Sequence, residues 1–122
     1  MILLDSNVLI YLKDPIYAAK IASLLKGHRI ATSNIIIAEV LGYKLLAQQD
    51  AVYFREFFDS MNNLVFDDLV TKKVIELRKT LKIQVPDAII AATAIVNDAT
   101  LWTHNTEDFT AIDALSIFDP II

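Results

Sequence analysis

Short runs of apolar residues alternate along the chain with longer segments in which apolar side chains recur every three or four residues. The short runs show no alternation of polar and apolar positions, which is typical of strands buried on both faces of a sheet. The longer segments have the spacing of helices that pack along one side. Strands are therefore predicted at 1–5, 29–33, 64–66, 100–103 and 116–118.

Helices are predicted in the segments between these strands. Pro15 and Pro86 each suit the first turn of a helix, and Gly27 suits the residue just beyond a helix end. The predicted helices cover 6–12, 15–27, 34 to about 48, about 50 to 62, 67 to about 82, and 86 to about 97. Short buried strands that alternate with helices predict an α/β fold, with a parallel sheet covered by helices on both faces.

Composition narrows the class of protein. The chain has 122 residues, 55% of them hydrophobic, with two Gly and three Pro and no segment that reads as a repeat or linker, so 1–122 is interpreted as one domain. No apolar run approaches the roughly 18 residues of a membrane span, and the start does not resemble a signal peptide. Without Cys, disulfides and thiolate zinc sites are excluded. These features predict a cytoplasmic protein that does not enter the membrane.

Four acidic residues stand in or beside apolar segments, where an acid has little structural reason to be: Asp5, Glu39, Asp87 and Asp108. An ionised carboxylate in apolar surroundings costs several kcal/mol unless something compensates its charge. A divalent cation would compensate all four, and carboxylate oxygens are the ligands that Mg²⁺ or Mn²⁺ prefers. Because ligands bind beyond the carboxyl ends of parallel strands, we expect the four acids to gather at that edge of the sheet.

Each acid also has an ordinary structural interpretation. Asp5 could cap the helix that follows it, and Asp87 could favour the N-terminal turn of its helix through the helix dipole. Asp108 could cap a short turn, where Glu107 could replace it in any role. Glu39 is the hardest to explain structurally, since the helical residues around it are apolar on all sides.

The net charge of −4 does not by itself exclude a nucleic-acid substrate, although such proteins usually carry basic patches. Subtracting the four candidate ligands from the 15 acidic residues leaves 11, which equals the 11 Lys plus Arg. The remainder of the protein is then neutral, and a bound cation would offset much of the charge of the site.

The chain resembles the PIN-domain ribonucleases, most closely the VapC-type toxins of type II toxin–antitoxin pairs. Four segments in family order carry the resemblance and span the chain from its start to its last predicted strands. They are Leu4-Asp5-Ser6-Asn7-Val8-Leu9-Ile10; Thr32-Ser33 followed by Ala38-Glu39-Val40; Val85-Pro86-Asp87-Ala88-Ile89-Ile90-Ala91-Ala92-Thr93-Ala94; and Thr103-His104-Asn105-Thr106-Glu107-Asp108-Phe109.

The resemblance implies a three-layer α/β/α PIN-like fold with a parallel sheet of about five strands, and a metal-dependent endoribonuclease that uses Mg²⁺ or Mn²⁺. The catalytic and metal-binding residues would be Asp5, Glu39, Asp87 and Asp108. Substrate-binding groups would be Ser6, Asn7, His104 and Asn105, with His104 at a position where relatives often have Arg. The resemblance also implies an RNA substrate, a cognate antitoxin as partner, and a homodimer.

Two other classes of protein fit the same residues less well than a nuclease does. A non-catalytic PIN-like module that binds RNA or protein has no need for a costly cluster of four acids. A receiver-type domain would use Asp5 as a phosphoacceptor, but such domains usually have a further acid close to it and a Lys late in the chain. Here Ser6 follows Asp5, and no Lys occurs after Lys82.

Overall fold

The computed structural model describes all residues from Met1 to Ile122. Its centre is one five-stranded sheet in the order β3-β2-β1-β4-β5, and every neighbouring pair is parallel. The strands are β1 (Ile2–Leu4), β2 (Ile30–Thr32), β3 (Asn62–Asn63), β4 (Thr100–Trp102) and β5 (Ile117–Phe118). The prediction of a parallel sheet of about five strands is confirmed.

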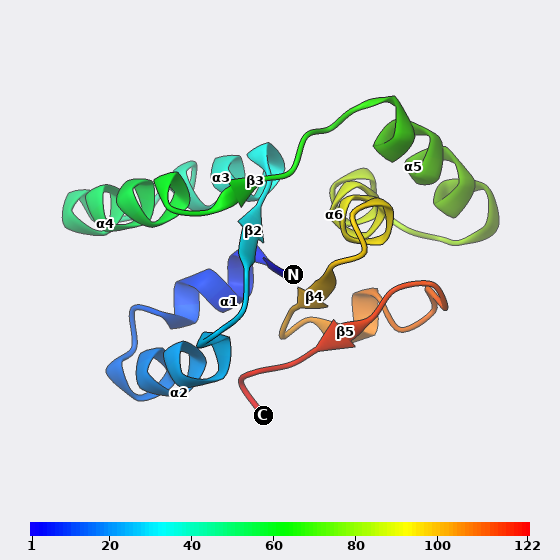
Figure 1. Ribbon diagram of the computed structural model, residues 1–122. Coiled ribbons are helices and arrows are strands. Elements are labelled where there is room, and N and C mark those ends of the chain that lie inside the picture. Colours follow the sequence, from blue (N-terminus) through cyan, green and yellow to red (C-terminus); the bar gives the residue numbers. More distant parts are fainter.

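Six α-helices and one 3₁₀ turn connect the strands. They are α1 (Ser6–Tyr11), α2 (Pro15–Leu25), α3 (Asn34–Leu41), α4 (Gln48–Asp59), α5 (Asp68–Thr80), α6 (Val85–Val96) and η1 (Thr106–Asp108). The α1–α2 pair and the α5–α6 pair lie on opposite sides of the sheet, while α3 and α4 lie toward its β2–β3 end (Figure 1). This arrangement is the three-layer α/β/α architecture expected from the resemblance. No helix is long and apolar enough to cross a membrane.

The central strand β1 is the point where the sheet changes direction. From β1 the chain adds β2 and β3 on one side, then returns to add β4 and β5 on the other. In the β1–β4 pair, Leu3 is opposite Leu101 and Leu4 is opposite Trp102. In such sheets the crevice at the carboxyl ends of the two strands beside the reversal is where ligands bind.

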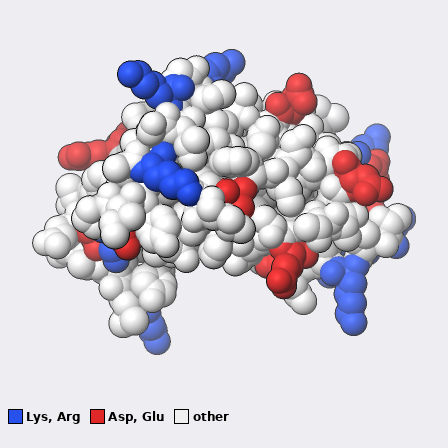
Figure 2. All heavy atoms as spheres, turned by 90° about the horizontal axis from the view of Figure 1, so that it is seen from below, with Lys and Arg blue, Asp and Glu red and all other residues white.

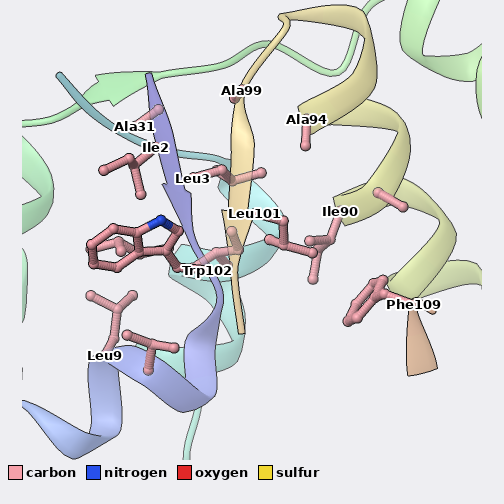
Figure 3. Packing of buried hydrophobic residues seen from close by; sticks show 14 of the residues in the cluster. Ile2, Leu3, Leu9, Ala31, Ile90, Ala94, Ala99, Leu101, Trp102 and Phe109 are labelled. Atoms are coloured by element: carbon pink, nitrogen blue, oxygen red, sulfur yellow. The ribbon is translucent and has the colours of Figure 1, made fainter. Parts of the chain in front are cut away.

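Side chains from the central strands reach into both layers of helices. Figure 3 shows Trp102 on the same side of the sheet as Leu9 of α1, while Leu101 points toward Ile90 of α6. All four residues belong to one cluster of 24 buried apolar residues. Because consecutive strand residues point to opposite faces, strands buried on both faces lack a polar alternation. The central strands are thereby held rigidly behind the edge where they end.

The long helix predicted from 34 to about 48 is wrong in its extent. The helix ends at Leu41, and Gly42 caps it with its N–H bonded to the Ala38 carbonyl oxygen at 2.8 Å. A Cβ on Gly42 would lie only 2.5 Å from that oxygen, so the backbone approaches too closely there for a larger residue. The apolar residues beyond it, Tyr43 and Leu45, are exposed, which is why helical spacing alone overestimated the helix.

The third strand was also predicted in the wrong place. Instead of 64–66, the strand is Asn62–Asn63, which pairs with β2. Val65 and Phe66 are 70% and 51% exposed and lie outside the sheet. An edge strand with both residues exposed gains nothing from apolar side chains, so its location cannot be recognised by an apolar run.

Candidate active site

The four predicted acids come from four different elements that meet at the carboxyl edge of the sheet. Asp5 directly follows β1, and Asp108 is the last residue of η1, which follows β4. Glu39 belongs to α3, which begins after β2, and Asp87 belongs to the first turn of α6, which leads into β4. A helix that leads into a parallel strand begins at the carboxyl edge, so this topology brings Asp87 to the end where Asp5 lies.

Asp5 is the most buried of the four, and only 5% of the residue is exposed. It is the N-cap of α1, and its Oδ1 accepts a hydrogen bond from the Ser6 N–H at 2.8 Å. Its Oδ2 accepts from the Thr103 hydroxyl at 2.8 Å and from the Asn7 amide at 3.4 Å. Asp5 therefore caps a helix and is also a buried carboxylate whose donors are all uncharged.

A short polar network links the ends of β1 and β4. Beyond its bond to Asp5, the Thr103 hydroxyl accepts from the Asn105 N–H at 3.1 Å and from the Asn7 amide at 3.4 Å. The side-chain oxygen Oδ1 of Asn7 in turn accepts from the His104 N–H at 3.1 Å. These bonds fix the loop after β4 against the start of α1, so the predicted substrate-binding residues Asn7, His104 and Asn105 lie in one network with Asp5.

The carboxylates influence one another electrostatically. Burial is the largest cause that raises the pKa of Asp5, and the Asp108 charge adds to it. Burial, together with the charges of Asp108 and Asp5, raises the pKa of Asp87. The pKa of Glu39 is raised as well, first by partial burial and then by Asp5 and Asp87. Each of the four acids therefore lies close enough to at least one other for their charges to interact.

Glu39 lies at the rim of this group. It is solvent-exposed on the surface of α3, although the surrounding protein removes enough water to raise its pKa. The Ser6 side chain acts in the opposite direction, since its hydrogen bonding lowers the pKa of both Asp5 and Glu39. Ser6 therefore affects the pKa of both the most buried acid and the exposed acid of α3.

None of the four acids has a basic partner within the protein. The ion pairs of the molecule are Lys13–Asp50, Lys73–Glu76 and His104–Asp119. On the face seen in Figure 2, blue and red side chains are interspersed, and no large basic patch forms. The negative charge of the site is thus not neutralised by the chain itself.

The donor chemistry of the site fits a hard divalent cation, since carboxylates are the ligands that Mg²⁺ and Mn²⁺ favour. The Thr32 and Ser33 hydroxyls at the end of β2 are buried without a hydrogen-bond partner, which adds two more oxygen groups at this edge. In the present side-chain positions no three acidic or imidazole groups converge closely enough to form a cation site. Mg²⁺ usually keeps several of its waters, so a site lined by a few carboxylates would suit it.

Comparison with known proteins agrees with this geometry. The PIN domain family model matches residues 2–115. The chain belongs to the PIN-domain family. Comparison with curated protein sequences found no match.

Solved structures similar to this PIN domain come from toxin–antitoxin complexes. A chain of VapBC2 from Rickettsia felis, bound to a DNA fragment from their promoter, is 30% identical with a TM-score of 0.81. A chain of a toxin–antitoxin complex from Klebsiella pneumoniae gives the same identity and TM-score. A chain of VapBC-1 from nontypeable Haemophilus influenzae is 27% identical with a TM-score of 0.76. In each case 98% of both chains is covered, which confirms the resemblance to VapC-type PIN domains.

Two residues at the carboxyl edge of the sheet in this PIN domain were not among the site residues predicted from the sequence. Thr103 bonds to Asp5, and Asp119 bonds to the His104 ring at 2.9 Å. Thr103 is a buried hydroxyl directly after a strand, and Asp119 is an acid directly after the last strand. The rule that drew attention to Asp5, a polar residue at a strand's carboxyl end, would have found both.

The loop after β4 also forms a shallow hollow of about 250 Å³. Its walls contain no apolar residue and are formed by His104, Asn105, Thr106, Glu107 and Asp108. The hollow contains one candidate metal ligand, Asp108, and two of the predicted substrate-binding residues. A polar hollow beside the acids is suited to a charged, hydrated part of a ligand.

Proposed function

We propose that this PIN domain is a metal-dependent endoribonuclease and the toxin of a toxin–antitoxin pair. The observation that carries the nuclease proposal is the group of four mutually repelling carboxylates, none paired with a base, at the ligand-binding edge of the sheet. A pure binding module would gain nothing from this repulsion. An enzyme that recruits a divalent cation would use these unpaired carboxylates as its ligands.

Asp5 and Asp87 are proposed as the direct ligands of Mg²⁺ or Mn²⁺, and Glu39 and Asp108 as residues that hold its waters or a second ion. When bound, such an ion polarises a phosphate and lowers the pKa of a water molecule. Thr103 and the Ser6 N–H hold the Asp5 carboxylate in one orientation, so the ligand is positioned before the ion arrives.

The remaining polar residues are proposed to receive the RNA. Asn105 and His104 line the hollow beside Asp108, and Asn7 fixes the backbone of His104. Ser6 donates its backbone N–H to Asp5, and its side chain lowers the pKa of both Asp5 and Glu39. Single-stranded loops are the expected targets, because their unstacked bases and phosphates are accessible. Hydrolysis by an activated water leaves 5′-phosphate and 3′-hydroxyl ends.

The nuclease proposal is tested by incubating purified protein with a mixed RNA pool in Mg²⁺, Mn²⁺ or EDTA. Cleavage is expected with either cation, not in EDTA, and not by the Asp5→Asn variant. Asp59→Asn is the matched control, because it removes the same charge from an exposed residue at the end of α4. Ends carrying 2′,3′-cyclic phosphate would contradict the mechanism. A folded protein that binds RNA but neither cuts it nor binds the cation would support a non-catalytic PIN-like module.

The toxin assignment is supported by the complexes in which similar chains occur. The chains at 30% identity come from VapBC2 and from a toxin–antitoxin complex. We therefore expect a small cognate antitoxin to bind this PIN domain and to suppress cleavage, and the PIN domain itself to form a homodimer. Purification from the native host, followed by light scattering and mass spectrometry, tests both. A monodisperse monomer without a partner would count against them.

A further inference from the structure

A second buried carboxylate lies at the same edge of the sheet as Asp5. Asp119 directly follows β5, and its side chain is only 8% exposed. Its Oδ2 lies 2.9 Å from Nδ1 of His104, and its Oδ1 accepts from the Ile121 N–H at 2.9 Å. Both oxygens are therefore engaged, and one of them is bonded to a residue of the hollow beside the acids.

The contacts of Asp119 determine how the imidazole is used. An ionised carboxylate only accepts hydrogen bonds, so Nδ1 of His104 must carry the hydrogen in this pair. No protein group bonds Nε2, and the side chain remains 37% exposed. The nitrogen opposite Asp119 is consequently free to contact a ligand.

Two further contacts restrict the ring and its backbone. The Tyr11 ring packs against the imidazole edge to face, with centroids 5.5 Å apart and planes at 85°. Tyr11 is itself packed against Tyr17 at 5.0 Å. The His104 N–H donates to Asn7, whose amide also bonds to Asp5. A side chain on a loop is thus fixed from three directions, which is how a binding group is held in advance of its ligand.

The charge distribution indicates what His104 binds. It is the only basic residue lining the hollow, which otherwise contains the acids Glu107 and Asp108. An RNA strand that enters a site of unpaired carboxylates is repelled at each phosphate that a cation does not cover. With Nδ1 held by Asp119, the imidazolium form presents an Nε2–H that can donate to a phosphate oxygen.

We propose that Asp119 is a positioning residue that holds His104 as a phosphate-binding group, contacting a backbone phosphate next to the one that is cleaved. This inference rests on the proposed ribonuclease function. Asp119 does not touch the RNA and acts only through the imidazole. The RNA passes over the hollow, so His104 contributes to substrate binding rather than to the activation of water.

Kinetics on a single-stranded RNA that the wild type cleaves test this role. Both Asp119→Asn and His104→Gln should raise KM about tenfold and change kcat little, because a contact made equally in ground and transition states affects binding alone. Asp119→Asn should have no further effect in the His104→Gln variant, since it acts through that ring. His104→Arg should restore a low KM and be insensitive to Asp119→Asn. Asp113→Asn, an exposed acid on the same segment, controls for net charge.

Ring ¹⁵N spectra give a readout that does not depend on cleavage. The chain has only two His, so exposed His28 serves as the internal reference. Single-stranded RNA or inorganic phosphate should shift the His104 Nε2 signal, and Asp119→Asn should weaken that shift. If the wild type cuts no RNA but the shift occurs, the ribonuclease proposal fails while the phosphate site stands. An unchanged KM in Asp119→Asn, or additive effects of the two variants, would overturn the inference.

Discussion

Asp5 and Asp119 are two buried carboxylates at one edge of one sheet, each directly after a strand, yet their surroundings differ. Asp5 accepts from a backbone N–H, a hydroxyl and an amide, all uncharged, and other carboxylates lie nearby. Asp119 is bonded to an imidazole, which can carry a positive charge. Burial is similar in the two cases, so the difference lies in whether the protein supplies the opposite charge.

This difference separates a cation-binding role, proposed for Asp5, from a positioning role, proposed for Asp119. Hydrogen bonds from neutral donors stabilise an ionised Asp5, but burial outweighs them and raises its pKa. A cation from outside would supply the opposite charge that the protein does not provide here. Asp119 already has a side chain that can carry the opposite charge, His104, at 2.9 Å. The first residue is therefore expected to act on the reaction and the second on the position of its neighbour.

Replacing each acid by its amide should affect different kinetic parameters. Asp5→Asn should lower kcat by roughly 100-fold or more, because the site then lacks a charge that the cation requires. Asp119→Asn should leave kcat nearly unchanged. Steady-state cleavage of one defined RNA by both variants makes the comparison. Equal losses of kcat would mean that the two carboxylates do not have separate roles.

Divalent cations should stabilise the protein through Asp5 and not through Asp119. Any ligand that binds only the folded state adds stability, about 2.7 kcal/mol when it is present at 100 times its Kd. Mg²⁺ or Mn²⁺ should therefore raise Tm by several degrees in the wild type and in Asp119→Asn, and much less in Asp5→Asn. Na⁺ at matched ionic strength is the control. A Tm shift that persists in Asp5→Asn would place the ion elsewhere.

The contrast between the two acids also shows what the sequence could predict. Asp5, Glu39, Asp87 and Asp108 were recognised because each interrupts or borders an apolar segment, and the structure brings them to one edge. Their roles as ligands remain predictions. Asp119 also follows a predicted strand, 116–118, so its place at this edge could have been predicted but its role could not. Its partner His104 is 15 residues away, and no local pattern relates the two.

The elements of the fold also differ in how well the sequence predicted them. The central strands β1 and β4 are buried on both faces, so all their residues except Thr100 are apolar, and the predicted bounds were accurate to within one residue. The edge strand β3 consists of two exposed Asn residues, and its position depends on backbone bonds such as Leu64 N–H to the Thr32 carbonyl oxygen at 2.8 Å. Backbone pairing leaves no side-chain pattern in the sequence. The end of α3 at Gly42 was missed because the apolar residues after it are exposed rather than buried.

Without divalent cations, the two amide substitutions should change stability in opposite directions. Asp5→Asn removes a carboxylate whose pKa is raised by burial and by Asp108, so the folded state should become slightly more stable at neutral pH. Asp119→Asn weakens a charge-assisted hydrogen bond to His104 and should cost about 1 kcal/mol. Urea unfolding in EDTA measures both free energies. Destabilisation by Asp5→Asn would mean that the bonds its Oδ2 accepts from Thr103 and Asn7 outweigh the relief of repulsion.

The smallest expected effect is a pH dependence of stability in EDTA. Asp5, Glu39 and Asp87 have pKa values raised in the folded state, so the unfolded chain releases their protons first as pH rises. The stability that their protonated forms contribute is complete below about pH 4, and it is lost as pH rises through the raised values. The unfolding free energy measured from pH 4 to 7 should therefore contain a component that decreases as pH rises. This component should be smaller in Asp5→Asn and unchanged in Asp119→Asn. Saturating Mg²⁺ should reverse its sign, because the cation binds the ionised carboxylates. A component that is identical in wild type and Asp5→Asn would show that the repulsion lies outside this site.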